Sequence, residues 1–163
     1  MGQKEEIETI KDRQITLKLS DVDVKRLCEK SGAVGLTVSE LLQNFIGDLV
    51  DGTYTNGSDE RMLANQWFER CWFSIFPEYT FLRFLIDYNV VEDTIEEWNE
   101  INCFKELEEP DEDDKEDLTY YEECIDEKFE EYRGHRKDRA EEVKLDVEMK
   151  KVINWWEQYK QML

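Results

Sequence analysis

The chain of 163 residues contains little that interrupts a helix, with only 2 prolines and 7 glycines. It also lacks any apolar run near the ~20 residues that a membrane-spanning helix needs. Residues 1–11 contain no apolar stretch like that of a secretory signal, so we expect a cytoplasmic protein with no membrane contact. The length suits one domain, or one small domain with a helical extension.

Residues suited to metal binding and nucleophilic catalysis are equally scarce. The single histidine, His135, lies far from four widely spaced cysteines, and no Cys-x-x-Cys pair exists. A zinc site is therefore not expected, and reduced thiols are the better interpretation. A nucleophile pair would have one possible base, and no phosphate-binding glycine loop is present. We predict a protein that is not an enzyme and needs no cofactor or metal.

Basic residues are also scarce, and the shortage is concentrated in one part of the chain. The chain has 21 Lys and Arg against 41 Asp and Glu, a net charge of −20. Residues 92–131 hold 20 of the acids and 3 of the bases, so nearly the whole imbalance lies in forty residues. Such a surface repels nucleic acid and lipid headgroups, which favours a basic protein as partner.

The chain is predicted to be mainly α-helical, with one strand near its start. Arg13–Leu19 alternates between apolar and polar side chains, the pattern of a half-buried strand. Ser20 with Asp23, and Thr37 with Glu40, have the spacing of capping boxes and predict two helices. A lone strand leaves its edges unpaired, so we predict a homodimer through antiparallel pairing of this strand, with Phe45 and Leu49 in the shared core.

This strand–helix–helix order over residues 13–51 resembles the ribbon-helix-helix family. The resemblance implies that outward strand side chains read the DNA major groove, and it assigns that role to Gln14, Thr16 and Lys18. Their chemistry is compatible with base contacts. The preceding Lys4-Glu5-Glu6-Ile7-Glu8 is not the basic arm of a DNA-binding member, however. An ordinary solvent face is the favoured alternative, and we expect weak or no direct DNA binding.

We expect three segments: a ribbon-helix-helix-like module at 13–52, a central helical core at 58–109, and an acidic run with a helical hairpin at 110–163. In the centre, one helix is predicted from Ser58 to Pro77. The aromatic residues of the whole central segment are assigned to the core, rather than to the stacking of bases. Among the large aromatic side chains so assigned are Trp67, Trp72 and Trp98.

The last segment is predicted to be an antiparallel coiled-coil hairpin. Apolar residues recur at 3-4 spacing in Leu118–Tyr132 and again in Leu145–Leu163, with a junction near Gly134. The dense acidic run before it has no glycine at the sixth position of an EF-hand loop, so calcium binding is not expected. Either it is a solvated linker or it binds a basic channel. The residues predicted for this contact are Asp111, Glu112, Asp113, Asp114, Glu116 and Asp117.

A second resemblance covers the centre of the chain. NFIGDLVDGTYTNGSDER at residues 44–61 and NQWFERCWF at 65–73 resemble small proteins of phages and mobile elements, among them the type II-A anti-CRISPR proteins that inhibit Cas9. This resemblance implies a bacterial host and a basic, nucleic-acid-binding protein as target, such as Cas9 with its guide RNA. The predicted function is thus an acidic, non-catalytic inhibitor of a nucleic-acid-binding effector. The alternative is a ribbon-helix-helix regulator that binds DNA.

Overall fold

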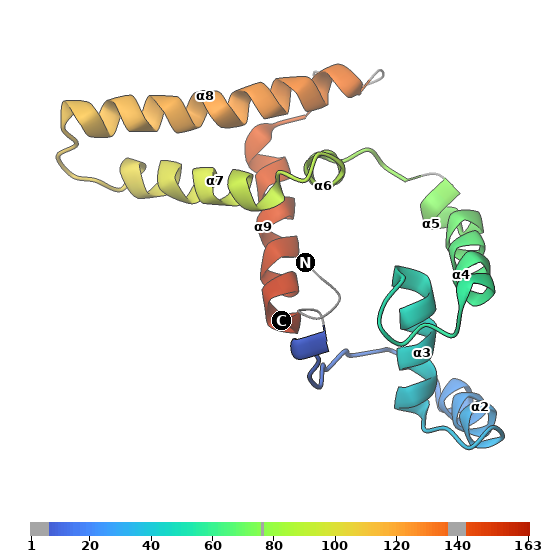
Figure 1. Cartoon of the computed structure of the whole chain (residues 1–163). Coiled ribbons are helices and arrows are strands. Elements are labelled where there is room, and N and C mark those ends of the chain that lie inside the picture. Colours follow the sequence, from blue (N-terminus) through green and yellow to red (C-terminus); the bar gives the residue numbers. More distant parts are fainter. Residues whose placement is uncertain (1–6, 76, 137–142) are drawn as a thin grey trace. The chain divides into compact units, whose positions relative to one another are not determined.

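The computed structural model describes residues 7–75, 77–136 and 143–163, and the regular elements of these ranges are helices (Figure 1). The predicted strand at Arg13–Leu19 was wrong, because residues 11–20 have no regular structure. Its apolar members Ile15, Leu17 and Leu19 are about half exposed, so no packed face holds them in a pleat. The chain divides into two compact units, Met1–Pro77 (unit 1) and Glu78–Leu163 (unit 2).

Unit 1 begins with two capped helices, α2 (Asp21–Gly32) and α3 (Val38–Val50). The Ser20 side chain accepts the backbone N–H of Asp23, which satisfies one unpaired donor of α2. Thr37 and Glu40 form the predicted capping box at the start of α3, with bonds of 3.1 and 2.7 Å. The local sequence therefore defines where both helices begin.

The loop after α3 folds back onto that helix. Asp48 is buried, and its carboxylate accepts the backbone N–H of Asn56 at 2.7 Å and the Thr55 hydroxyl at 2.9 Å. The Asn56 side-chain amide also donates to this carboxylate, at 2.8 Å. This last bond is the largest cause of the lowered pKa of Asp48, and the backbone N–H of Asn56 is the next. A Cβ on Gly47 would lie 2.6 Å from the backbone carbon of Tyr54, so only glycine permits this close approach.

The predicted helix from Ser58 to Pro77 is divided in two. Helix α4 covers Ser58–Arg70, and α5 covers Trp72–Ile75. Cys71 between them has an extended backbone, with φ −69° and ψ 145°. The break turns the aromatic residues of α5 onto a new axis, which periodicity along one helix does not anticipate.

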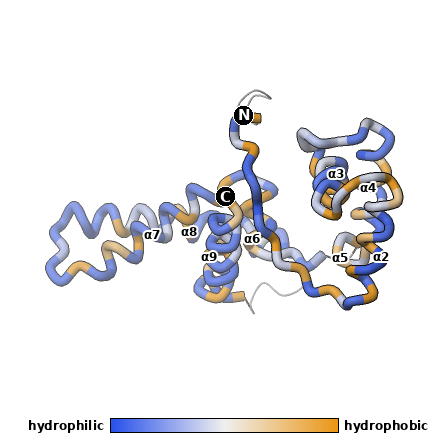
Figure 2. The backbone as a smooth tube through the Cα atoms, turned by 90° about the horizontal axis from the view of Figure 1, so that it is seen from below, coloured by the Kyte–Doolittle hydropathy of each residue, from blue (hydrophilic) through white to orange (hydrophobic). Residues whose placement is uncertain are grey.

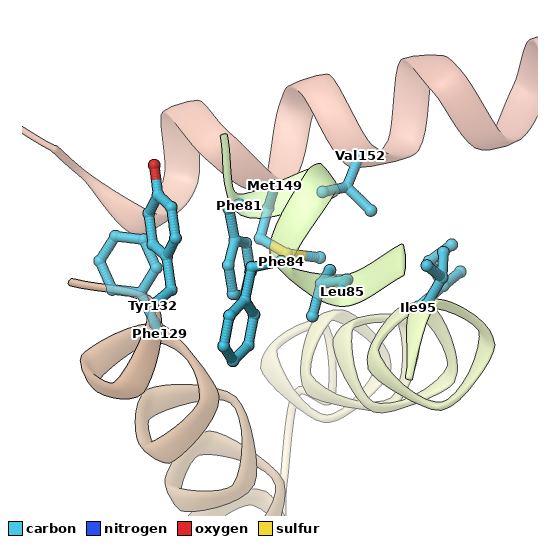
Figure 3. Packing of buried hydrophobic residues seen from close by; sticks show 9 residues of the cluster. Phe81, Phe84, Leu85, Ile95, Phe129, Tyr132, Met149 and Val152 are labelled. Atoms are coloured by element: carbon cyan, nitrogen blue, oxygen red, sulfur yellow. The ribbon is translucent and has the colours of Figure 1, made fainter. Parts of the chain in front are cut away.

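Unit 2 contains α6 (Phe81–Asp87), α7 (Val91–Lys105), α8 (Glu112–His135) and α9 (Leu145–Met162). In Figure 1, α7 and α8 lie side by side and α9 lies across them. Residues of all four helices converge on one core, of which Figure 3 shows the packing. The buried members are Phe81, Phe84, Leu85, Val91, Ile95, Phe129, Tyr132, Met149 and Val152.

Helix α9 is held to α6 by a buried carboxylate. Glu148 is only 3% exposed, and its Oε2 accepts the backbone N–H of Phe81 at 3.1 Å. Its Oε1 accepts from the Lys151 ammonium at 2.5 Å, and this bond is the first cause of the raised pKa of Lys151. A buried charge needs such partners, because an unpaired one would be costly.

The predicted coiled-coil hairpin of Leu118–Tyr132 with Leu145–Leu163 was wrong in its pairing. The antiparallel neighbour of α8 is α7, and α9 packs chiefly on α6. Ile125, Phe129 and Tyr132 are buried as the spacing predicted, and so are Met149 and Val152. An apolar stripe indicates which face is buried but does not identify the helix that covers it.

Candidate functional site

The hairpin of α7 and α8, called the acidic hairpin below, carries the local charge excess on a rigid frame. Ile101 of α7 and Ile125 of α8 are buried between the helices. Phe104 and Tyr121 stack with ring centroids 6.1 Å apart. Two ion pairs join the helices, Lys105–Glu122 at 2.7 Å and Lys128–Glu97 at 2.6 Å. The second pair is largely buried, which makes it less sensitive to salt than an exposed pair.

The three lysines of residues 92–131 are thus already engaged, since Lys115 pairs with Glu112 at 2.7 Å. The remaining carboxylates gain little compensation from bases within the hairpin. Most of them are exposed on the outer faces of the two helices, where Figure 2 shows long hydrophilic stretches. The exposed acids of α8 are Glu112, Asp113, Glu116, Asp117, Glu123, Asp126, Glu127, Glu130 and Glu131.

The six predicted contact residues do not share one role. Asp111 and Asp114 form a capping box that starts α8, with two bonds of 2.9 Å. Asp113, Glu116 and Asp117 are exposed on the first turns of the helix, and Glu112 is paired with Lys115. Residues Glu112–Asp117 are therefore helical rather than a linker. Negative charge in the first turn also stabilises the helix through its dipole.

One shallow hollow runs along this part of α8. Its volume is about 330 Å³, and its lining residues are Glu112, Lys115, Glu116, Thr119, Tyr120 and Glu123. Tyr120 is 61% exposed, and a hydrogen bond with Cys124 is the first cause of its raised pKa. The hollow lies on one helix face without an opposite wall, so it offers a place for a protruding side chain rather than for an enclosed ligand.

The residues predicted to read DNA do not lie on the strand that the prediction assumed. Gln14, Thr16 and Lys18 are exposed in a segment without regular structure. The ribbon-helix-helix mode needs a strand that presents alternate side chains to the groove. With that strand absent from residues 11–20, the segment presents no ordered row of side chains.

The central aromatic residues differ most from expectation. Trp98 packs against the core of unit 2, as predicted. Trp67 and Trp72, which were also assigned to a core, are 49% and 76% exposed. No local signal in the sequence marks this exposure, because consecutive apolar residues such as Phe84 and Leu85 are both buried in unit 2.

Comparison with known proteins brings no relative: no family model, curated protein or solved structure matches the chain. Among the residues described, no cluster of three His, Cys, Asp or Glu side chains could hold a metal ion. Within the same ranges, no helix is both long enough and apolar enough to cross a membrane.

Proposed function

We propose that the protein is a non-catalytic inhibitor whose acidic hairpin binds a basic, nucleic-acid-binding effector and competes with the nucleic acid. The anti-CRISPR proteins that inhibit Cas9 are the type of inhibitor meant, and a bacterial cytoplasm is the setting. The observation that carries the proposal is the placement of exposed carboxylates along two packed helices whose lysines are already paired.

The shape of the hairpin supports competition with nucleic acid. Side chains three and four residues apart on a helix lie about 5–6 Å from one another. A DNA duplex presents one phosphate charge per ~1.7 Å of its axis. The hairpin has a lower charge density, but its charge has the same sign and is extended along a rod. A channel built for phosphates would attract it, and electrostatic steering would make association fast and sensitive to salt.

The rigidity of the hairpin supports affinity as well. Its outer carboxylates lie on helices fixed by the buried Ile101 and Ile125 and by the Lys128–Glu97 pair. A preformed surface loses less conformational entropy on binding than a flexible acidic tail does.

The test neutralises charge without disturbing the helix cap. Asp113→Asn, Glu116→Gln and Asp117→Asn are combined, while Asp111 and Asp114 are left to cap α8. With a Cas9–guide RNA complex as the probe, we expect a roughly tenfold lower association rate and a flatter dependence on salt. The matched control removes three exposed acids of unit 1, by Asp12→Asn, Asp21→Asn and Glu69→Gln, and should retain the wild-type rate. Equal rates for the wild-type protein and the hairpin variant would contradict the proposal.

A further inference from the structure

Unit 1 carries a connected cluster of aromatic side chains at its surface. It joins Phe45 of α3, Trp67 and Phe68 of α4 and Phe73 of α5, and together with the exposed Trp72, which precedes Phe73 in α5, it is called the aromatic surface below. Phe45 contacts Trp67 at a centroid distance of 5.6 Å, and Trp67 contacts Phe73 at 6.3 Å. Phe68 contacts Phe73 at 5.4 Å. The exposed fractions are 43% for Phe45, 49% for Trp67, 43% for Phe68, 76% for Trp72 and 56% for Phe73.

This exposure is unusual because unit 1 has so little else that is buried. Among residues 7–75 and 77, Ala64 is the one buried apolar side chain. A domain of this length normally depends on burial of large apolar side chains for its stability. Contiguous apolar patches of several hundred Å² on a soluble protein mark interaction sites. The aromatic surface is therefore expected to be covered in solution.

The parts of the chain outside the described ranges are poorly suited to cover it. Residues 1–6 have the sequence MGQKEE and residues 137–142 have the sequence KDRAEE, so they are mostly polar or charged. Residue 76 is a single phenylalanine. The area required is much larger than these can supply: half-exposed aromatic side chains show on the order of 100 Å² each, or roughly 500 Å² for five.

Charge favours a second copy at this surface and opposes one at the acidic hairpin. Residues 1–77 carry 9 bases and 13 acids, a net charge of −4. Residues 78–163 carry 12 bases and 28 acids, a net charge of −16. Contact between two copies of the aromatic surface therefore brings little like charge together, whereas contact between two hairpins would bring much.

The aromatic surface also has the two complementary parts that a two-fold interface needs. Trp72 is its most exposed member. Cys71, which directly precedes Trp72 in the sequence, lines a hollow of about 390 Å³. The other lining residues are Leu63, Gln66, Trp67 and Arg70. In a two-fold dimer the same patch faces itself, so each protrusion meets the partner copy's hollow. Exposed tryptophans that enter such hollows dominate the energy of many interfaces.

We propose that the aromatic surface is a homodimer interface, in which Trp72 of each copy enters the hollow beside Trp67 of the other. The exposed aromatic area amounts to more than half of the ~800 Å² per partner of a standard interface, and the flanking apolar residues Met62 and Leu63 extend it. This interface differs from strand pairing, since it uses side chains of α3, α4 and α5 and needs no strand. It is independent of what the acidic hairpin binds.

Sedimentation of the full chain tests the proposal. The wild-type protein should sediment as a dimer of twice its 19.7 kDa chain mass. Trp72→Glu should raise the dimer Kd by at least about 30-fold, as expected for a central tryptophan. The matched control is Tyr120→Glu on the acidic hairpin, where the side chain is 61% exposed, and it should remain dimeric. A wild-type protein that is monomeric at about 100 µM, a concentration where even weak dimers form, would overturn the proposal. A dimer that persists in the Trp72 variant would overturn it as well.

Crosslinking provides a second test that does not depend on how the Trp72 variant folds. Cys71 lines the hollow next to Trp72 and would lie near the two-fold axis, whereas Cys28 lies on α2. Two chains are prepared that retain only Cys71 or only Cys28, with serine at the other three cysteines. A short thiol-reactive crosslinker should join two copies through Cys71 and not through Cys28. Efficient crosslinking through Cys28 without crosslinking through Cys71 would contradict the proposed interface.

Discussion

The two units have similar lengths but bury their apolar residues to very different extents. Unit 2 places nine buried side chains from four helices in one cluster. Unit 1, over residues 7–75 and 77, buries Ser31, Gly47, Asp48 and Ala64, which are small or polar. Unit 1 nevertheless contains its share of large aromatic residues, among them Trp67 and Trp72. Apolar content alone therefore does not produce a core; the positions of the residues on the helices decide whether they converge.

The difference also suggests a division of roles. Unit 2 combines a closed apolar core with an acidic outer face, as expected for a rigid support that presents charge. Unit 1 is nearly neutral and exposes aromatic residues, as expected for a surface that buries area on association. Under our proposals the first unit brings two copies together and the second unit binds the effector. A dimer would then present two acidic hairpins, and avidity would strengthen binding to a target with two basic sites.

The largest expected difference between the units comes from removing one aromatic ring from each. Phe84 is 1% exposed in unit 2, so Phe84→Ala should lower the free energy of unfolding by about 3–5 kcal/mol. Phe68 is 43% exposed in unit 1, so Phe68→Ala should lower it by no more than about half as much. Urea unfolding of each variant, followed by circular dichroism, measures both losses.

Protein concentration sharpens this comparison. If unit 1 dimerises, the loss caused by Phe68→Ala should depend on protein concentration, because the substitution also weakens association. The loss caused by Phe84→Ala should not. Equal losses at both positions would show that unit 1 contains a core as complete as that of unit 2.

Two glycines provide a smaller contrast, with opposite signs. A Cβ added to Gly47 would lie 2.6 Å from the backbone of Tyr54. Gly47→Ala should therefore destabilise unit 1 by roughly 1–3 kcal/mol. Gly134 lies near the end of α8, and a Cβ there would have no neighbour within 4 Å. Gly134→Ala should stabilise unit 2 by roughly 0.5–1 kcal/mol through its helix propensity. Thermal unfolding of both variants tests these two predictions. Stabilisation by Gly47→Ala would contradict the close contact between Gly47 and the backbone of Tyr54.

Much of the local structure follows from the sequence, because its causes are local. The capping pair Thr37 and Glu40 defined the start of α3, and the 3-4 spacing of Ile125, Phe129 and Tyr132 identified the buried face of α8. The acidic stretch of the proposed site was visible in composition alone. The cap formed by Asp111 and Asp114 was not recognised, although Asp followed by Asp at the third position is a capping pattern.

The parts that failed depend on contacts between distant residues. Alternation at Arg13–Leu19 predicted a strand, but a strand forms only where another strand pairs with it. The partner of α8 could not be identified from its own stripe, because α7 and α9 both carry apolar residues that are buried. Likewise the buried Glu148 lies 67 residues from the Phe81 N–H that it accepts, so no spacing rule connects them.

The smallest effect is expected where unit 1 has no regular structure. Gln14, Thr16 and Lys18 are exposed in residues 11–20, so changing all three to alanine removes no packed contact. We expect the free energy of unfolding to change by less than about 0.5 kcal/mol. Strong loss of stability would show that the segment is paired in solution.

The same triple variant addresses DNA binding. The wild-type chain, with its net charge of −20, should shift duplex DNA weakly or not at all, even at low salt where phosphate attraction is strongest. A gel-shift titration of the wild-type protein and the triple variant at low salt measures this. If the wild-type protein bound one sequence tightly and the variant did not, these three side chains would be reading bases. In that case unit 1 would be the functional unit, and the acidic hairpin of unit 2 would only repel non-specific DNA.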